Sequence, residues 1–476
     1  MHHRPHPVTH WAAALLLVFA LSAAGCGARR GPVHPAEMAF PPLRFSPPEA
    51  ERVVLDCGAP LYLFSDARLP LFSFHAMARA GSAFDPEGKE GLAALVAELI
   101  RTGGSAGMDA DEVDRRLEYL GAELSAAADH DGAACALSCL SRDTEEALGI
   151  ALDLLLRPAF SPEKIDLRKD QVREAIRRWN DEPGQTAARE FRRLVYGAHP
   201  YAHPVIGEPS SMDRIGRGDL VAFHRARFNP SGMIFGAAGE FDRETLVKTL
   251  NDAFGPARSP APAPPPPVEG REERLVFLVR RPTEQAHLLV GHAGIPRDDP
   301  DYFPVMVMNE ILGGGVFSSR ILERVRTAEG LAYSAGSRFT PAVRAGLFYA
   351  SCQTKENTAA RALDILLEEM ERIRTEPVTD QELRRAKDSR LNSFVFNFTS
   401  PSQVVEQMIG IEFAGLPRDY LKTWPEKVAA VTREDVRRAA QAHLRPGAAT
   451  ILALGDGEAL PPALERFGPL RPLVPR

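Results

Sequence analysis

A long internal repeat constrains the fold of this chain more than any other feature of its sequence. Residues 211–241 and 429–456 share a pattern of apolar, acidic, proline and glycine positions, and the matched positions lie 216 residues apart. The pairs are Ile215 and Val431, Asp219 and Asp435, Leu220 and Val436, Pro230 and Pro446, and Gly239 and Gly455. Both segments have the pattern of a helix, a proline-containing turn and an apolar strand that ends at glycine. A repeat this long indicates a duplicated domain rather than a solenoid of short units.

A proline-rich segment separates the two copies. Residues 256–267 read PARSPAPAPPPP, with seven prolines in twelve residues, and this composition is typical of a semi-rigid, extended linker. We therefore predict an N-terminal domain at 51–255, a linker at 256–270 and a C-terminal domain at 271–470.

Helix and strand patterns are mixed within each copy. The predicted strands lie at 71–80 and 133–140, and the predicted helices lie at 91–101, 109–120, 144–156 and 163–181. A helical segment at 303–315 corresponds to the one at 91–104, and Thr379 with Glu382 forms a capping pattern that opens a helix through Arg390. The mixture predicts an α+β class with two antiparallel-rich sheets, each covered by helices.

The composition excludes some functions. Lys and Arg number 57 and Asp and Glu number 63, which gives a net charge of -6. A nucleic-acid-binding protein needs a basic excess to neutralise phosphates, so we expect no nucleic-acid partner. The chain is 44% apolar over 476 residues and can build sizeable cores. It has no apolar run of membrane-spanning length after its N-terminus.

The N-terminus has the pattern of a secretory signal. Arg4 precedes an apolar run from Trp11 to Ala24, and the segment LSAAGC ends at Cys26. This ending resembles the lipobox of bacterial lipoproteins, although Ala23 stands where Leu is usual. We expect a signal peptide at 1–25, a lipid on Cys26 and a membrane tether at 26–50. Gly27 rather than Asp after the cysteine favours the periplasmic face of the outer membrane; the alternative is a plain secretory signal.

Other possible metal donors are few. Cys135 and Cys139 would lie about 13 Å apart in a strand, too far for a disulfide. A helix would bring them together, but two thiolates alone make a weak zinc site, so we predict small buried side chains. His199 and His203 are four residues apart in HPYAHP, but the prolines oppose a shared helical face.

Several segments resemble the insulinase/pitrilysin family of zinc metallopeptidases, the inverzincins. They are AGSAFDPEGKEGLAALVAELIRTGG, RPAFSPEKIDLRKDQVREAIRRWNDEP, HPYAHPVIGEPSSM and ILGGGVFSSRILERVRTAEGLAYSAGSRF. The resemblance covers about residues 50 to 460. It implies two similar halves that form a clamshell around peptide substrates. It also implies an H-x-x-E-H helix, whose two His bind zinc while the Glu activates the zinc-bound water.

This chain departs from the family at the zinc site. The two His positions hold Ala94 and Glu98, the general-base position holds Ala97, and the third ligand position, 77 residues beyond Glu98, holds Ala175. Glu174 is adjacent to that position but points about 100° away on a helix. One carboxylate cannot hold zinc. We therefore expect no catalytic site and no metal cofactor in this chain, and an ordinary helix whose small face packs inside.

The second half keeps a different part of the family's site. Arg326 and Tyr333 are spaced R-x6-Y in VRTAEGLAYS. The resemblance implies that this pair reaches the zinc-bearing half, binds the substrate backbone and stabilises the oxyanion. The alternative is a surface Arg and a core Tyr. We expect the preceding Gly313, Gly314 and Gly315 to form a flexible loop.

Some members of the family are heterodimers in which one subunit carries zinc and its partner supplies the Arg and Tyr. The sequence therefore suggests the non-catalytic, substrate-binding subunit of a heterodimeric zinc metalloendopeptidase, lipid-anchored in a bacterial cell envelope, with a zinc-bearing partner and a peptide substrate. A second hypothesis is a stand-alone peptide-binding or assembly scaffold without hydrolysis. A third, an active zinc peptidase, conflicts with the missing ligands.

Overall fold

The computed structural model describes residues 45–256, 265–315 and 318–475. From Ser46 onward these residues form one compact unit. The predicted signal peptide, Cys26 and most of the predicted tether lie outside the described residues, as does the middle of the proline-rich linker. No helix within the described ranges combines the length and the apolarity that crossing a bilayer requires.

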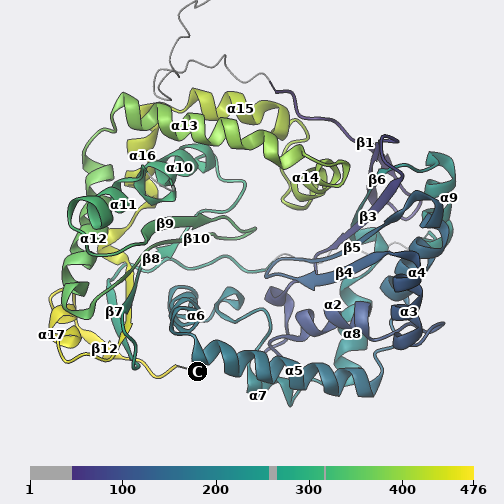
Figure 1. The fold of residues 1–476 in the computed structure, drawn as a ribbon, viewed down its shortest axis with the longest axis horizontal. Helices are drawn as coiled ribbons and strands as arrows, with labels where there is room; N and C mark the ends of the chain where they lie inside the picture. Colours follow the sequence, from purple (N-terminus) through teal and green to yellow (C-terminus); the bar gives the residue numbers. More distant parts are fainter. Residues whose placement is uncertain (1–44, 257–264, 316–317, 476) are drawn as a thin grey trace, which may run out of the picture. The chain divides into compact units, whose positions relative to one another are not determined.

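The unit contains two six-stranded sheets that share the order of five strands and differ in the outer strands β1 and β12 (Figure 1). The first has the order β1-β2-β6-β3-β5-β4 and the second β12-β7-β11-β8-β10-β9. The first-half strands are β1 (Glu51–Val54), β2 (Pro60–Ser65), β3 (Leu71–Ala78), β4 (Glu123–Ala128), β5 (Ala133–Leu140) and β6 (Ile234–Gly239). The second-half strands are β7 (Leu275–Arg280), β8 (Ala286–Ala293), β9 (Ala335–Thr340), β10 (Leu347–Thr354), β11 (Thr450–Gly455) and β12 (Leu470–Pro472). In each sheet an inner strand, β6 or β11, is parallel to one neighbour and antiparallel to the other.

Helices accompany both sheets. Those of the first half are α2 (Leu92–Thr102), α3 (Ala110–Leu120), α4 (Thr144–Leu156), α5 (Pro162–Asp181), α6 (Pro183–Tyr196), α7 (Pro209–Met212), α8 (Arg217–Arg227) and α9 (Arg243–Phe254). Those of the second half are α10 (Tyr302–Asn309), α11 (Arg320–Leu322), α12 (Ala359–Thr375), α13 (Asp380–Phe394), α14 (Pro401–Phe413), α15 (Tyr420–Ala430), α16 (Arg433–His443) and α17 (Leu460–Glu465). The α+β class predicted from the sequence is confirmed.

The predicted repeat is real at the level of single elements. Helix α8 and helix α16 begin 216 residues apart, and so do β6 and β11. Two of the predicted N-terminal capping interactions are present. The carboxylate of Asp109 accepts the N–H of Glu112 at 2.9 Å, and Thr379 forms a capping box with Glu382.

The two halves exchange one helix each. Helix α6 of the first half packs on β8 and β11 of the second sheet, and α14 of the second half packs on β2, β6 and β3 of the first sheet. A side chain on Gly236 of β6 would place its Cβ 2.0 Å from Val405 of α14, so only glycine allows this approach. Polar contacts fix the same helix, because Glu412 accepts two hydrogen bonds from Arg52 and one from Tyr62. Each sheet is therefore completed by a helix from the other half.

The glycines before Arg320 correct one expectation. Gly313 and Gly314 close a π-helical turn, η6 (Glu310–Gly314), which directly continues α10. A Cβ on Gly313 would lie 2.2 Å from the backbone nitrogen of Ser337 in β9. The prediction of a flexible loop at these two residues was wrong, because they form a packed turn that requires glycine for close approach to the sheet.

Candidate functional site

The degenerate zinc-site positions lie on two helices that pack together, α2 and α5. Ala94 and Ala97 are 8% and 1% exposed, and Ala97 belongs to the hydrophobic core of the first half. Glu98 points instead toward α5, where both Nε and a terminal nitrogen of Arg168 donate to its two carboxylate oxygens. Ala175 is half-buried and lies seven residues, or about two turns, after Arg168 on the same face of α5.

These residues do not fit a zinc ion. Zinc in a peptidase needs three donor side chains and an open position, whereas Ala94 and Ala175 have no donor atom. The one carboxylate, Glu98, is already engaged on both oxygens by a guanidinium, which is a strong bidentate arrangement. No chemical step through a metal can be derived at this place.

The start of α2 is held by a side chain that sequence reasoning missed. Asp85 accepts the backbone N–H groups of Gly91 at 2.7 Å and Ala93 at 2.8 Å. Burial raises the pKa of Asp85 to about 7, although these donors pull it down. The signal was a carboxylate six residues before the first helical turn, a spacing longer than that of an ordinary N-cap.

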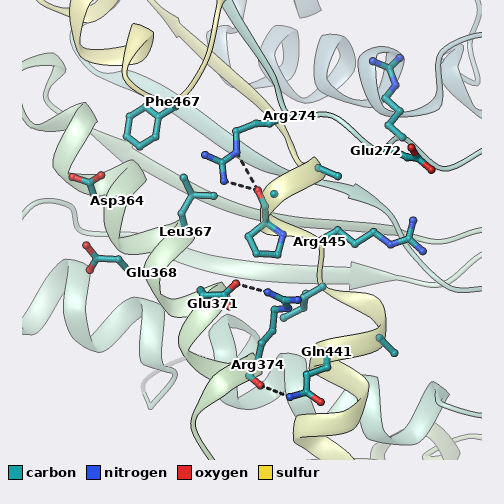
Figure 2. A pocket seen from close by; sticks show the side chains of 16 residues that line it. Glu272, Arg274, Asp364, Leu367, Glu368, Glu371, Arg374, Gln441, Arg445 and Phe467 are labelled. Atoms are coloured by element: carbon teal, nitrogen blue, oxygen red, sulfur yellow. Dashed lines mark hydrogen bonds and ion pairs between the residues drawn. The ribbon is translucent and has the colours of Figure 1, made fainter.

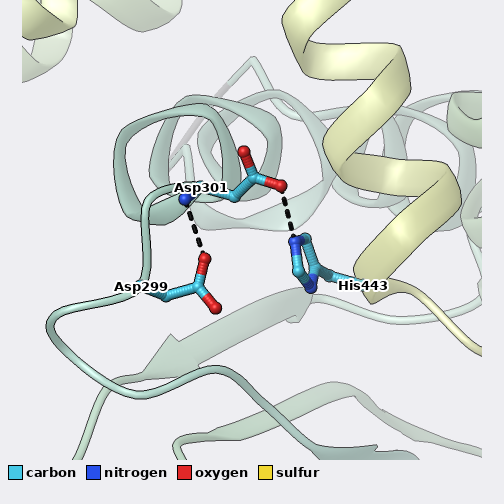
Figure 3. A group of neighbouring side chains, drawn as sticks. All are labelled: Asp299, Asp301 and His443. Atoms are coloured by element: carbon cyan, nitrogen blue, oxygen red, sulfur yellow. Dashed lines mark hydrogen bonds and ion pairs between the residues drawn. The ribbon is translucent and has the colours of Figure 1, made fainter.

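Among the described residues, one group of carboxylate and imidazole donors is close enough to suggest a metal: Asp299, Asp301 and His443 (Figure 3). The three side chains of this group already form hydrogen bonds within the group and to Arg438. Asp301 binds His443 at 2.8 Å and Arg438 at 2.7 Å, and Asp299 accepts the N–H of Asp301 at 2.8 Å. Sequence analysis missed this group because Asp301 and His443 are 142 residues apart in the chain.

The residues that were considered and rejected as metal donors have structural contacts. His199 bonds the carbonyl of Pro266 at 2.9 Å through Nε2 and accepts the N–H of Tyr201 at 3.1 Å through Nδ1, which leaves neither nitrogen for a metal. Cys135 and Cys139 lie in β5, buried and reduced, as predicted. Burial raises the pKa of these thiols to about 12 and about 11, so they remain protonated.

Arg326 and Tyr333 lie in the segment that leads into β9. Arg326 is half-buried in a second π-helical turn, η7 (Glu323–Ala328), and Tyr333 is 89% exposed, two residues before the strand. The alternative of a core tyrosine is therefore wrong. The phenol of Tyr333 makes no hydrogen bond to any residue that the structure describes.

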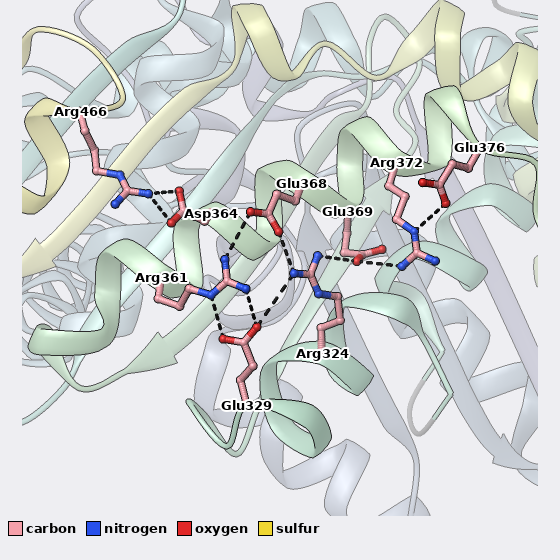
Figure 4. A network of polar contacts seen from close by, with 9 residues as sticks. All are labelled: Arg324, Glu329, Arg361, Asp364, Glu368, Glu369, Arg372, Glu376 and Arg466. Atoms are coloured by element: carbon pink, nitrogen blue, oxygen red, sulfur yellow. Dashed lines mark hydrogen bonds and ion pairs between the residues drawn. The ribbon is translucent and has the colours of Figure 1, made fainter.

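A network of ion pairs fastens this segment to α12 (Figure 4). Arg324 binds the fully buried Glu369 at 2.8 Å and Glu368 at 2.7 Å, and Arg361 binds Glu329 at 2.6 Å. Networks of this kind hold geometry better than isolated surface pairs do. The ion pairs of Arg324 and Glu329 therefore hold the backbone before and after Arg326.

A cavity lies elsewhere, between α12, α16 and the turn after α16 (Figure 2). Its volume is about 960 Å³ and its walls carry charges of both signs. Several of these groups are already bound, since Arg274 donates to the carbonyl of Pro446 at 2.8 Å and Gln441 donates to the carbonyl of Arg374 at 3.0 Å. None of the predicted site residues lines it.

Family models match both halves of the chain, and known proteins have similar sequences. Residues 76–208 match the family model described as insulinase (peptidase family M16), and residues 214–390 match that of the peptidase M16 inactive domain. A protein named "uncharacterized zinc protease" from Streptomyces coelicolor is 27% identical over 73% of this chain and 78% of its own length. A Helicobacter pylori protein named a non-peptidase homologue is 23% identical over 79% of this chain and 87% of its own length.

Solved structures agree. A peptidase M16 inactive domain from Pseudomonas fluorescens superposes with a TM-score of 0.79 at 28% identity, over 86% of this chain and 98% of that one. A protease from Helicobacter pylori shares the fold, with a TM-score of 0.77 at 17% identity over 86% of this chain and 99% of that one. With two M16-type halves, this chain belongs to the insulinase family, peptidase family M16, as an inactive-type homologue.

Proposed function

We propose that the chain is the non-catalytic, substrate-binding subunit of a heterodimeric zinc metalloendopeptidase. In this proposal Arg326 and Tyr333 complete the active site of a zinc-bearing partner of the same family. The observation that carries it is the contrast between the two predicted sites: the metal-ligand positions of the first half have no free donor, whereas the Tyr333 phenol of the second half is 89% exposed.

The chemistry of the pair suits this role. A phenol O–H and a guanidinium donate hydrogen bonds to an oxyanion that develops when water attacks a peptide carbonyl. Arg326 stands in the η7 segment that the α12 ion pairs fasten, so it can act as a preorganised donor. Tyr333, free of hydrogen bonds to the described residues, can turn toward a ligand without breaking one.

Peptide binding also has a structural basis. Strand β4 and strand β9 are the outer strands of their sheets and each pairs on one side only. An unpaired strand edge can accept an extended peptide as an additional strand. Tyr333 lies two residues before β9, so a peptide on that edge would pass the phenol.

For location we propose a lipid on Cys26 that anchors the chain at the periplasmic face of a bacterial outer membrane. The proline- and glycine-rich residues that follow would act as a tether. If this is correct, Cys26→Ser should release the protein into the soluble periplasmic fraction or leave an unprocessed precursor. A Cys26→Ser protein that is processed and remains membrane-bound would contradict the lipid anchor.

A stand-alone peptide-binding scaffold is the second candidate. The Helicobacter pylori relative named a non-peptidase homologue favours it. Purification of the native membrane complex separates the two candidates. A co-purifying family member with an intact H-x-x-E-H motif supports the heterodimer, and its absence supports the scaffold.

The decisive experiment uses the reconstituted pair and steady-state peptide cleavage. Arg326→Ala and Tyr333→Phe should each lower kcat/KM by about 10²-fold, as loss of an oxyanion donor does in other hydrolases. The matched control is Tyr119→Phe, because Tyr119 is also highly exposed but lies on α3 of the first half. Both site variants should still bind the zinc subunit. Unchanged cleavage in both variants would exclude the shared active site.

A further inference from the structure

Helix α14 is joined to the first sheet by a histidine in addition to the contacts described above. His75 lies in β3, and its imidazole Nε2 is 2.8 Å from the hydroxyl oxygen of Ser402 at the start of α14. The same hydroxyl donates to a carboxylate oxygen of Glu406 at 2.9 Å, and that oxygen lies 3.7 Å from Nε2. Three polar side chains therefore connect the two halves of the molecule at this place.

The imidazole of His75 is enclosed between the sheet and the helix. Its side chain is 12% exposed, and the residues opposite it on the neighbouring strands are Ala136 of β5 and Gly236 of β6, neither of which titrates. The second ring nitrogen, Nδ1, has no hydrogen-bond acceptor among the residues that the structure describes. Burial lowers the pKa of His75, and attraction to Glu406 offsets this only in part. The ring is therefore neutral at neutral pH while the helix is in place.

The charged groups around this contact are few. Helix α14 carries two carboxylates, Glu406 and Glu412, and no basic side chain. Glu412, six residues further along, is bound by the first sheet as described above. Arg79, which follows β3, donates to the carbonyl of Phe413 at 2.6 Å, at the far end of the helix. Glu406 is therefore the carboxylate that can stabilise a charged imidazole here, and its side chain is 51% exposed.

The apolar part of the contact between α14 and the first sheet is small. Its buried members form a cluster separate from the main core of the first half: Tyr62, Ile234, Ala238, Val405 and Ile409. The buried cluster that includes residues of α6, the other exchanged helix, is larger. Segments with few buried apolar contacts open locally at a lower free-energy cost than the rest of a protein. The polar contacts of α14 therefore weigh more in keeping it in place.

We propose that α14 is an acid-sensitive latch between the two halves, and that protonation of His75 releases it from the first sheet. A proton on Nδ1 adds a charge and a donor in a place that has little water and no acceptor for it, and both are solvated once the helix has left. Because the pKa of His75 is lowered only while the helix is in place, the stabilisation is fully present above pH 6.5 and is lost as the pH falls below it. This inference does not depend on the heterodimer or on hydrolysis.

Hydrogen exchange of residues 401–413 in the full-length chain, followed by mass spectrometry, tests the latch. After correction for the intrinsic exchange rate, protection of α14 should fall between about pH 7.5 and about pH 5.5, by up to about tenfold per pH unit below 6.5, the limit for one titrating group. His75→Gln keeps a donor for Ser402 but cannot titrate, so it should abolish this fall. The matched control is His224→Gln, because burial also lowers the pKa of His224, which bonds the carbonyl of Leu155 instead. That control should show the wild-type fall.

Glu406→Gln tests the same latch from the other side. The glutamine still accepts the Ser402 hydroxyl but no longer attracts an imidazolium, so the pKa of His75 falls further and the loss of protection in acid should be at least as large as in the wild type. Because this side chain is 51% exposed, the variant serves as the test if His75→Gln does not fold. No acid-dependent fall in the wild type, an undiminished fall in His75→Gln, or a smaller fall in Glu406→Gln would overturn the proposal.

Discussion

Each half of the molecule contains an ion pair between a glutamate and an arginine that joins two of its helices. Glu98 on α2 and Glu310 at the end of α10 occupy corresponding places in the repeat, and each binds an arginine from the long helix that follows. Arg168 of α5 serves Glu98, and Arg390 of α13 serves Glu310 at 2.8 Å. In the family the first of these places is a metal ligand. In this chain a carboxylate–guanidinium bridge joins the helices in both halves.

The pairs differ in burial. The side chain of Glu310 is 11% exposed and also accepts a hydrogen bond from Ser389, whereas that of Glu98 is 31% exposed. The sheets differ as well. Gly236 lies under α14, while its repeat partner Leu452 belongs to the buried cluster that includes Phe191 of α6. The same strand position therefore holds glycine in one half and leucine in the other, beneath the helix that the opposite half contributes.

The largest expected effect comes from the packing beneath the exchanged helices. Leu452→Ala should lower the free energy of unfolding by about 2–5 kcal/mol, because it leaves a cavity under α6. Gly236→Ala should cost about 1–3 kcal/mol for the opposite reason, since its methyl group meets Val405. Chemical denaturation measures both. If Gly236→Ala were neutral, the close approach of α14 would not constrain the fold.

The next effect is a sensitivity to acid at Glu382 in the second half. Burial raises the pKa of Glu382, but the buried Arg320 and the capping bonds of α13 together outweigh this effect and lower the pKa to about 2. Because the folded pKa lies below the unfolded value, the stabilisation of up to about 3 kcal/mol is present above pH 4.5 and is lost as the pH falls toward 2.

Glu382→Gln provides the comparison for this acid effect. Urea unfolding of the wild type and the variant should differ most at neutral pH, and the difference should shrink progressively below pH 4.5. A difference that stays constant down to pH 3 would show that Glu382 does not titrate in this way.

Removing the arginine from each of the two ion pairs should destabilise the two halves to different degrees. Arg390→Ala leaves the well-buried Glu310 short of a partner and should cost about 1–3 kcal/mol of unfolding free energy. Arg168→Ala leaves the more exposed Glu98 and should cost less than about 1 kcal/mol. Thermal unfolding of the two variants in parallel measures the order. The reverse order would mean that the first-half bridge carries more stability than its exposure suggests.

The smallest effect concerns metal binding after a graft. The quadruple change Ala94→His, Ala97→Glu, Glu98→His and Ala175→Glu supplies the missing donors, but it leaves the Arg168 cation beside them. Adding Arg168→Ala should raise zinc affinity by about tenfold, or about 1.4 kcal/mol. Zinc titration of both grafts measures this. Equal affinities would show that Arg168 can turn away from the site. Ala94→His and Glu98→His alone should give no peptidase activity.

Much of the fold could be predicted because its signals are local. The caps at Asp109 and Thr379 and the buried strand with Cys135 and Cys139 depend on residues close together in the chain. The repeat could be recognised because each copy carries the same local pattern. That Ala94 and Ala175 stand at lost zinc-ligand positions stays a prediction, because it depends on the resemblance to the family's motif. The exposure of Tyr333 excluded the alternative that this residue is a core tyrosine.

The remainder depends on how distant elements meet. Glu98 and Arg168 are 70 residues apart, and only the packing of α2 on α5 brings them together. The same is true of Asp301 with His443, and of His75 with Ser402. The packed turn at Gly313 escaped prediction because a glycine run is typical of loops, and its close neighbour, Ser337, belongs to another element.

The helix exchange has a consequence for the order in which this protein can fold. Arg52 and Tyr62 at the start of the first sheet bind Glu412, 360 and 350 residues later in the chain. A nascent first half therefore emerges with the β6 side of its sheet uncovered until α14 has been made. Contacts of such long sequence separation slow folding and expose apolar surface meanwhile. We expect the first half produced alone to aggregate, and to become soluble when the second half is supplied in the same cell.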